Sequence, residues 1–188
     1  MNGKRLVIGI SGASGAIYGI RLLTLLAERP DVDTHLVVSR AARLVIAHEV
    51  EQTVERIEAL ADVAYHPDDL AAPIASGSFT TDGMVIAPCS IKTLSAVANS
   101  YAANLIRRAA DVTLKERRPL VLVVRETPLH LGHLRLMARA TEIGATILPP
   151  IPAFYGQPKT IDDLIDETLG RVLVHLGVET ELYTHWEG

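Results

Sequence analysis

Short apolar runs along the chain alternate with longer stretches in which apolar residues recur every third or fourth position. Apolar runs of about four to eight residues favour buried strands, and the longer period favours helices. The predicted strands are 4–10, 33–38, Val63–His66, Gly83–Ala87, Leu120–Val124 and Thr146–Leu148. The predicted helices are Ala16–Glu28, Ala41–Val50, Ser90–Ala98 with Ser90 as its cap, Asn104–Lys115, His130–Ile143 and Ile161–Leu176.

Three parts of this pattern are less regular. The helix that begins at Ala41 either continues or restarts toward Leu60. Pro88 is expected to stop the strand before it, because proline has no amide hydrogen for a strand ladder. The segment from Asp68 to Thr81 contains proline, glycine and several hydroxyl residues, so it is expected to be a loop.

This alternation predicts an α/β protein with a parallel sheet covered by helices on both faces. We expect a three-layer α/β/α, Rossmann-like fold with a mainly parallel six-stranded sheet. Since no linker or repeat interrupts the pattern, residues 1–188 should form a single domain, with a C-terminal tail from about residue 178. In such sheets, ligands bind beyond the carboxyl ends of the strands.

Composition narrows the class of protein. The 188 residues are 48% hydrophobic and 21% charged, which is typical of a globular protein. A net charge of −4 gives no electrostatic argument for nucleic acid binding. The single cysteine excludes an intrachain disulfide framework, and His130 and His133 lack a third ligand for a metal. No signal peptide or membrane span is apparent, so a cytoplasmic protein is expected.

The loop Ser11–Ala16 follows the first apolar run and opens a helix. Glycine and a helix N-terminus allow backbone amides to approach a phosphate closely. Ile10 replaces the first glycine of a dinucleotide fingerprint, Ser39 replaces its ribose-binding acid, and the Gly-Lys-Ser/Thr of a Walker loop is missing. A mononucleotide therefore remains, although a tight turn of small residues explains the loop equally well.

Further unusual residues follow other strands. Pro88–Thr93 brings hydroxyl groups to a helix N-terminus, Arg125–Pro128 places a charged pair after the most apolar strand, and Ser39 adds a hydroxyl. Each is, alone, more typical of a helix cap or a solvated loop. Because the carboxyl ends of parallel strands share one edge of the sheet, together they favour a mononucleotide site.

Six stretches, spread over nearly the whole chain, form one family pattern. They are Gly12–Gly19, Ala75–Ser78, Ala87–Leu94, Asn104–Leu120, Arg125–Pro128 and Pro152–Tyr155. On these stretches the chain resembles the UbiX-type flavin prenyltransferases, a family that includes accessory subunits of hydroxyarylic-acid decarboxylases.

The resemblance implies a reaction and partners. Family members join dimethylallyl phosphate to reduced FMN, first at N5 and then at C6, without a metal. The prenylated FMN serves a separate UbiD-type decarboxylase. Family members are homo-oligomers, usually dodecamers, whose sites combine neighbouring subunits. Two alternatives are an accessory flavin-binding subunit and a related FMN-binding decarboxylase, although the catalytic histidine of those decarboxylases has no match within 67–80, and His66 lies ahead of Pro67.

The resemblance also implies site residues, although Arg108, Lys115 and Arg171 are by position equally typical of solvated helix faces. The implied catalytic residues are Ser14, Glu49 and Glu126. The implied FMN contacts are Gly12, Ala13, Ser14, Ser39, Ser90, Ile91, Lys92, Thr93 and Arg125. The implied contacts with dimethylallyl phosphate are Tyr155, Arg171, Arg108, Lys115 and Trp186. Charge-assisted bonds to the leaving phosphate would lower the barrier to C–O cleavage.

Overall fold

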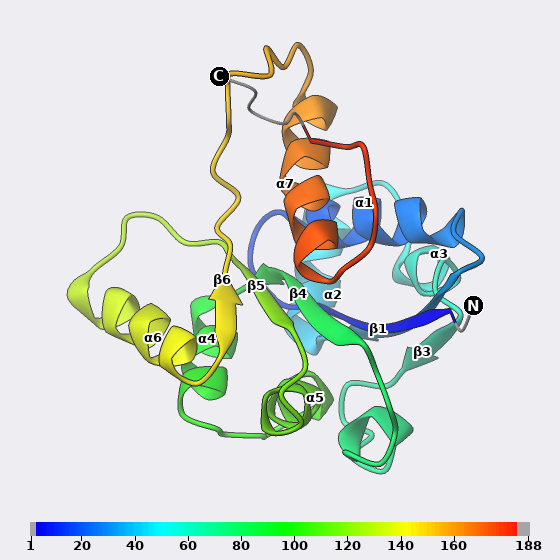
Figure 1. Cartoon of the computed structure of the whole chain (residues 1–188), viewed down its shortest axis with the longest axis vertical. Coiled ribbons are helices and arrows are strands. Elements are labelled where there is room, and N and C mark those ends of the chain that lie inside the picture. The colour runs from blue at the N-terminus through cyan, green and yellow to red at the C-terminus, as the bar shows by residue number, and fades with distance from the viewer. Residues whose placement is uncertain (1–2, 184–188) are drawn as a thin grey trace.

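A computed structural model describes residues 3–183, so Trp186 lies outside the described residues. Six strands form one sheet in the spatial order β3-β2-β1-β4-β5-β6, and every neighbouring pair is parallel (Figure 1). The strands are β1 (Lys4–Ile10), β2 (Val32–Val38), β3 (Val63–Tyr65), β4 (Gly83–Cys89), β5 (Leu120–Val124) and β6 (Ala145–Ile147). The predicted six-stranded α/β fold is confirmed, and its pairings are all parallel.

Helices cover both faces of this sheet and complete the three layers. They are α1 (Ala16–Ala27), α2 (Arg40–Glu49), α3 (Val54–Glu58), α4 (Ile91–Ala98), α5 (Leu105–Lys115), α6 (Leu131–Glu142) and α7 (Ile161–His175), with a short 3-10 turn at Pro73–Ala75. Within the described part of the chain, no helix has the length and apolar character needed to cross a membrane.

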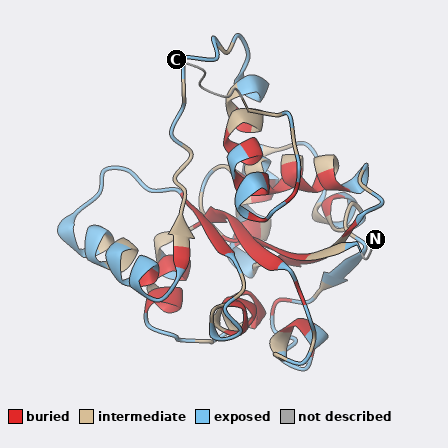
Figure 2. Ribbon diagram, in the orientation of Figure 1, coloured by how far each residue is buried: buried red, intermediate tan, exposed pale blue. Residues whose placement is uncertain are grey.

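Two cores lie on opposite faces of the sheet. Leu6 and Ile8 of β1 pack with buried residues of α1, α2, α3 and α7. Val7, between them, packs on the other side with residues of α4, α5 and α6. The central strands are buried along most of their length (Figure 2), because a parallel sheet covered on both faces leaves them no solvated side.

The second predicted helix restarts rather than continues. α2 ends at Glu49, and α3 begins at Val54 after Thr53, whose side chain accepts a hydrogen bond from the Arg56 amide at 3.4 Å. This break lets the chain turn before it enters β3.

Pro88 does not end β4, which corrects the sequence expectation. The strand continues to Cys89, and its pairing with β5 shifts register between Ile86 and Cys89. The Ala87–Pro88 peptide is cis. The ladder tolerates the missing proline amide because the register shift falls at the same place.

Helix starts and the last strand differ slightly from expectation. Asn104 and His130 are caps rather than first helical residues, and each side chain accepts an amide hydrogen bond from its own first turn. β6 spans Ala145–Ile147, one residue earlier than the predicted strand. Side chains of these residue types compete for free amides at a helix start, so they lie just outside the helix.

Candidate functional site

The loops after β1, β4 and β5 lie side by side at the carboxyl edge of the sheet. The Ser11 hydroxyl donates to the carbonyl oxygen of Pro88 at 2.8 Å and accepts from the amide of Ser90 at 2.8 Å. The Arg125 amide donates to the Cys89 carbonyl oxygen at 3.1 Å. The Ser11 hydroxyl and the Arg125 amide therefore join the loops that the sequence analysis expected to converge.

The loop after β2 joins the same surface. The Ser39 amide donates to the carbonyl oxygen of Ile10 at 3.0 Å. Gly12 approaches α2 so closely that an added Cβ would lie 2.4 Å from the Cβ of Ala41. Glycine at this position thus allows the first loop to pack against α2, and the half-exposed Ala13 and exposed Ser14 stay at the surface.

Two of the predicted FMN-contacting hydroxyls serve as helix caps. The Ser39 hydroxyl accepts from the Ala42 amide at 3.0 Å, at the start of α2. The Ser90 hydroxyl accepts from the Thr93 amide at 3.3 Å and donates to the Thr93 hydroxyl at 3.1 Å, at the start of α4. Beside them, Ile91 is half-buried and Lys92 is exposed. Free amides of both first turns lie at the edge where an anion would bind.

Glu49 occupies the N-terminus of α1. Its Oε2 accepts from the amides of Gly15 at 2.8 Å and Ala16 at 3.1 Å. Burial acts to raise the pKa of Glu49, but hydrogen bonds from the Ser14 hydroxyl and those two amides, together with the attraction of Arg125, hold the pKa below its ordinary value. The Glu49 carboxylate therefore occupies this helix end, beside the loop that the sequence analysis considered for phosphate binding.

A cavity of about 450 Å³ opens beside this carboxylate. Its polar lining residues include Ser14, Arg125 and Glu126, and the Glu126 carboxylate accepts from the Thr127 amide at 3.1 Å. The other lining residues are Gly15, Tyr18, Val124, Thr127, Leu129, Met137, Pro149, Pro150 and Ile151. A mainly apolar wall with a few polar groups is typical of a site for a small organic ligand.

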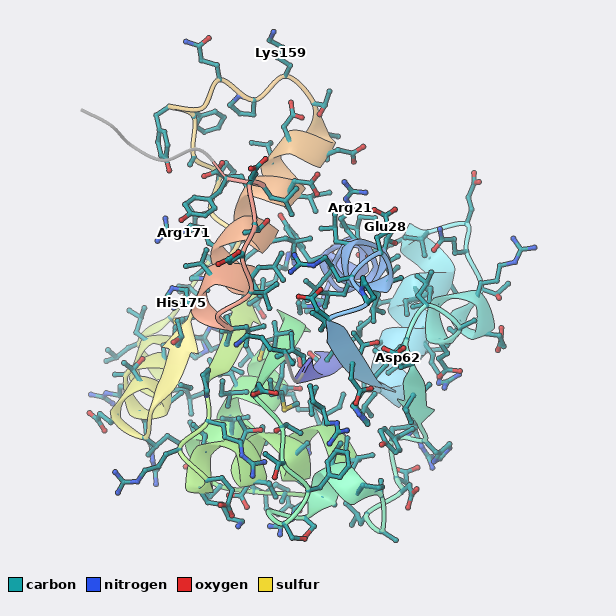
Figure 3. The ribbon with its side chains drawn as sticks, turned by 45° about the vertical axis from the view of Figure 1, so that its right-hand side comes forward. Arg21, Glu28, Asp62, Lys159, Arg171 and His175 are labelled. Carbon is teal, nitrogen blue, oxygen red and sulfur yellow. The ribbon has the colours of Figure 1, made fainter. Side chains whose placement is uncertain are left out.

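A second cavity of about 260 Å³ adjoins the first, since Pro149 and Ile151 line both. Arg171 of α7 lines it, and Figure 3 shows Arg171 and His175 on the same side of that helix. The Tyr155 hydroxyl, close by, donates to the carboxylate of Glu167 at 3.3 Å. Arg171 therefore lines the second cavity, and Tyr155 bonds to Glu167, another residue of its lining.

Arg108 and Lys115 line neither cavity of the single chain. The Arg108 guanidinium donates to the carbonyl oxygen of Ala75 at 3.0 Å and pairs with Asp111 at 3.0 Å. Lys115 pairs with Glu116. One copy of the chain thus does not bring these two residues to Tyr155 and Arg171, because α5 presents them toward the 73–77 turn.

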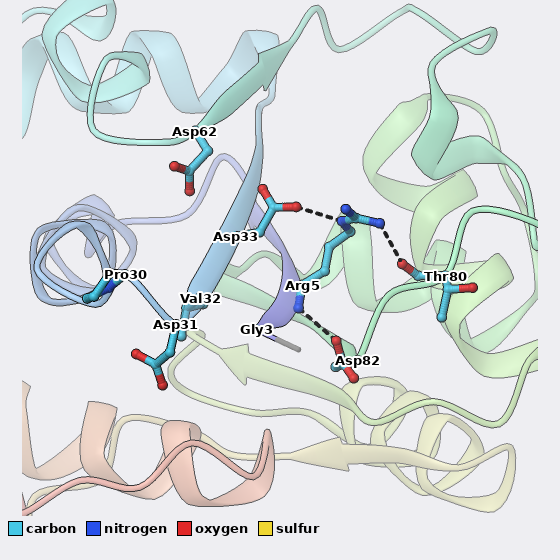
Figure 4. Close-up of a pocket in the computed structure, with 9 residues that line it drawn as sticks. All are labelled: Gly3, Arg5, Pro30, Asp31, Val32, Asp33, Asp62, Thr80 and Asp82. Atoms are coloured by element: carbon cyan, nitrogen blue, oxygen red, sulfur yellow. Dashed lines mark hydrogen bonds and ion pairs between the residues drawn. The ribbon is translucent and has the colours of Figure 1, made fainter. Parts of the chain in front are cut away.

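Another cavity, of about 600 Å³, lies at the opposite, amino edge of the sheet (Figure 4). Arg5 crosses it, donating to Asp33 at 2.7 Å from its side chain and to Asp82 at 2.7 Å from its amide. None of the predicted site residues lines it. Among the residues that the structure describes, no group of three histidine, cysteine or acidic side chains is placed to hold a metal ion.

Sequence reasoning missed several residues of the paired cavities. Met137 and the Pro149–Ile151 segment line the first, and Glu167 and His175 line the second. The spacing of Glu167 and His175, one helical turn on either side of Arg171, was a usable signal. Met137 and the proline segment had none, because their contacts depend on the packing of α6 and on the path of the chain after β6.

Comparisons of the amino-acid sequence with known proteins found a matching family and close relatives. A family model described as Flavoprotein matches residues 1–173. The chain is 58% identical over 187 residues to the flavin prenyltransferase UbiX of Escherichia coli K12, covering 98% of this chain and 99% of that protein.

Two solved structures have nearly the same fold. One is a dodecameric FMN-dependent UbiX-like decarboxylase from Escherichia coli O157:H7, with a TM-score of 0.95 and 46% identity, covering 98% of this chain and 100% of that one. The other is AnUbiX (PadA1) in complex with FMN and dimethylallyl pyrophosphate, with a TM-score of 0.95 and 47% identity, covering 99% of this chain and 98% of that one.

Proposed function

Because this chain belongs to the flavoprotein family, and within it to the UbiX-type flavin prenyltransferases, we propose that it transfers the dimethylallyl group of dimethylallyl phosphate to reduced FMN. The C–O bond of the donor breaks, phosphate leaves, and the five-carbon group becomes bonded first to N5 and then to C6 of the flavin. The product, prenylated FMN, goes to a UbiD-type decarboxylase. A cytoplasmic location is part of this proposal.

The main structural support for this proposal is the pair of adjoining cavities. The first, about 450 Å³ and mainly apolar, suits the flavin ring, while the second contains Arg171 and lies beside Tyr155. A ring and a phosphate ester held in neighbouring spaces would bring an allyl carbon to the flavin edge. The FMN phosphate would contact the first turn of α2 after Ser39, the turn that begins α4 and Arg125, because free amides and a guanidinium favour an anion.

Three side chains would move protons. Ser14 and Glu49 lie together at the N-terminus of α1, and the hydrogen bond between them would let the Glu49 carboxylate accept a proton through Ser14. Glu126, which lines the first cavity, would accept the proton that leaves during ring closure. Tyr155 would donate a hydrogen bond to the departing phosphate, and Arg171 would neutralise its charge.

We also propose that the working enzyme is a homo-oligomer, and that neighbouring copies complete the site. A structural relative at 46% identity is dodecameric. Arg108 and Lys115 lie outside both cavities of one chain, so they would reach the donor phosphate of a neighbouring copy. A contact between the allyl group and Trp186, outside the described residues, stays a prediction from the resemblance.

The decisive experiment is anaerobic incubation of the protein with reduced FMN and dimethylallyl phosphate, followed by mass spectrometry of the flavin. We expect a mass gain of one five-carbon unit and release of one phosphate per flavin. Oxidised FMN serves as the control and should give no adduct. Binding of reduced FMN without any adduct would contradict the proposal and would favour a flavin-binding accessory subunit.

A further inference from the structure

Glu167 places a negative charge in the cavity that is proposed for the donor phosphate. The cavity is lined by Glu167, by Arg171 one helical turn further along α7 and by His175 one turn beyond that. A carboxylate weakens the binding of an anion in the same small space, because like charges repel. Attraction for the phosphate accounts for Arg171 in this cavity, but it does not account for Glu167.

The neighbouring acids on α7 have other surroundings. Asp166 pairs with Arg21 of α1 at 2.8 Å, and Asp162 and Asp163 are exposed in the first turn. Glu167 is half-buried and lines the cavities on both sides of it. Glu167 is thus the acid of α7 that lines the cavity containing Arg171, whereas Asp163 and Asp166 line the cavity on its other side.

The hydrogen bond from Tyr155 to Glu167 gives the carboxylate a second effect. The Tyr155 hydroxyl lies 3.3 Å from Oε1 of Glu167. A phenol has one proton to donate. If this proton goes to a phosphate oxygen, it is withdrawn from Glu167, so the carboxylate and the phosphate compete for the same donor.

We infer that Glu167 sets how tightly this pocket holds phosphate, by taking the Tyr155 hydroxyl when the pocket is empty and repelling the anion when it is filled. This inference rests on the proposed function, in which the pocket receives the donor phosphate. Glu167 is a positioning residue that acts through Tyr155 and through its charge. Both effects weaken the retention of phosphate after C–O cleavage, and so they favour its release.

The inference is tested by binding of inorganic phosphate to the full chain with FMN bound, measured by calorimetry. Glu167→Gln keeps the size of the side chain and an oxygen that can accept from Tyr155, but removes the charge. We expect it to bind phosphate about threefold to tenfold more tightly, the size of effect that one partly exposed charge gives. Phosphate should inhibit prenylation by this variant more strongly by a similar factor.

Two further variants separate charge from shape. Glu167→Asp keeps the charge, so its affinity for phosphate should stay close to that of the unchanged protein. Asp162→Asn removes the same charge from α7, but Asp162 is exposed and lines neither of the cavities beside Glu167, so it should have no effect.

The inference is overturned if Glu167→Gln and the unchanged protein bind phosphate equally, or if neither binds it. It is also overturned if Glu167→Asp behaves like Glu167→Gln, because shape rather than charge would then be responsible. Failure of the proposed function gives a different result. It would appear as an absent adduct in the anaerobic assay of the unchanged protein, whereas the calorimetric comparison needs no turnover.

Discussion

Glu49 illustrates how a single side chain acquires its role from the fold. Along the sequence it is an acid at the end of a predicted helix, where an exposed carboxylate is the ordinary expectation. The turn after β1 brings the amides of Gly15 and Ala16 to it, from 34 and 33 positions away along the chain. That contact could not be derived from helical spacing, and only the family resemblance pointed to the residue.

We predict that Glu49→Gln affects adduct formation but not the affinity for FMN. The amide side chain can still accept from one backbone amide, so affinity for FMN should stay near that of the unchanged protein. Adduct formation should fall by about 100-fold or more, because a general base contributes on that order. Flavin fluorescence titration and the anaerobic mass assay measure the two quantities. Glu51→Gln, a change of an exposed neighbouring acid, is the control, and an equal loss of both properties would make Glu49 purely structural.

The pKa of Glu49 predicts a dependence of stability on pH. Its pKa is lower in the folded chain than in the unfolded chain, so the folded state binds a proton less readily. The stabilisation is therefore fully present above the ordinary glutamate pKa and is lost as pH falls through the lowered value. Urea unfolding across an acid series should show the difference between the unchanged protein and Glu49→Gln shrinking below the ordinary pKa. A difference that grows in acid would contradict this.

Among the elements, α1 and β4 approach each other closely near the site. An added Cβ at Gly19 would lie 2.4 Å from the carbonyl oxygen of Ala87 and 2.8 Å from the side chain of Ile10. The amphipathic spacing of α1 predicted the helix, and the apolar run predicted β4. Neither pattern indicated how closely the two would pack or that β4 would continue past Pro88, because both depend on contacts across the sheet.

We predict that Gly19→Ala destabilises the protein, although alanine is the better helix former. The methyl group must push α1 away from β4, and overpacking of this kind costs about 1–3 kcal/mol of unfolding free energy. Thermal unfolding would measure the loss. Ala27→Ser changes an exposed position of the same helix and should stay within about 0.5 kcal/mol. A stabilised Gly19→Ala variant would show that the helix shifts without cost.

For the whole molecule, the fold explains why the site lies at one edge of the sheet, and this much followed from alternating strands and helices. The division of the site into two adjoining cavities did not follow, because it depends on the proline segment after β6.

The surface of α6 has exposed apolar side chains. Leu131 is 60% exposed and Leu134 is 48% exposed, while Ala140 is the only buried residue of this helix.

We predict that this apolar surface of α6 contributes to assembly. Replacing Leu134 with Glu would put a charge where another copy packs, so the molecular mass in solution should fall. Size-exclusion chromatography with light scattering measures the change. Glu142→Gln, on the same helix, serves as the control and should leave the mass unchanged. An unchanged mass for Leu134→Glu would show that another surface holds the copies together.

The Ser11 hydroxyl, 2% exposed, ties the loop after β1 to the end of β4 and the loop that follows, because it donates to the Pro88 carbonyl oxygen and accepts from the Ser90 amide. The conformational entropy of two ligand-binding loops is therefore lost when the chain folds, not when the flavin arrives. FMN should consequently meet a surface already in its bound shape and associate without a slow rearrangement. Ser11→Ala would return that freedom to the loops, and the flavin would then have to order them with its own binding energy.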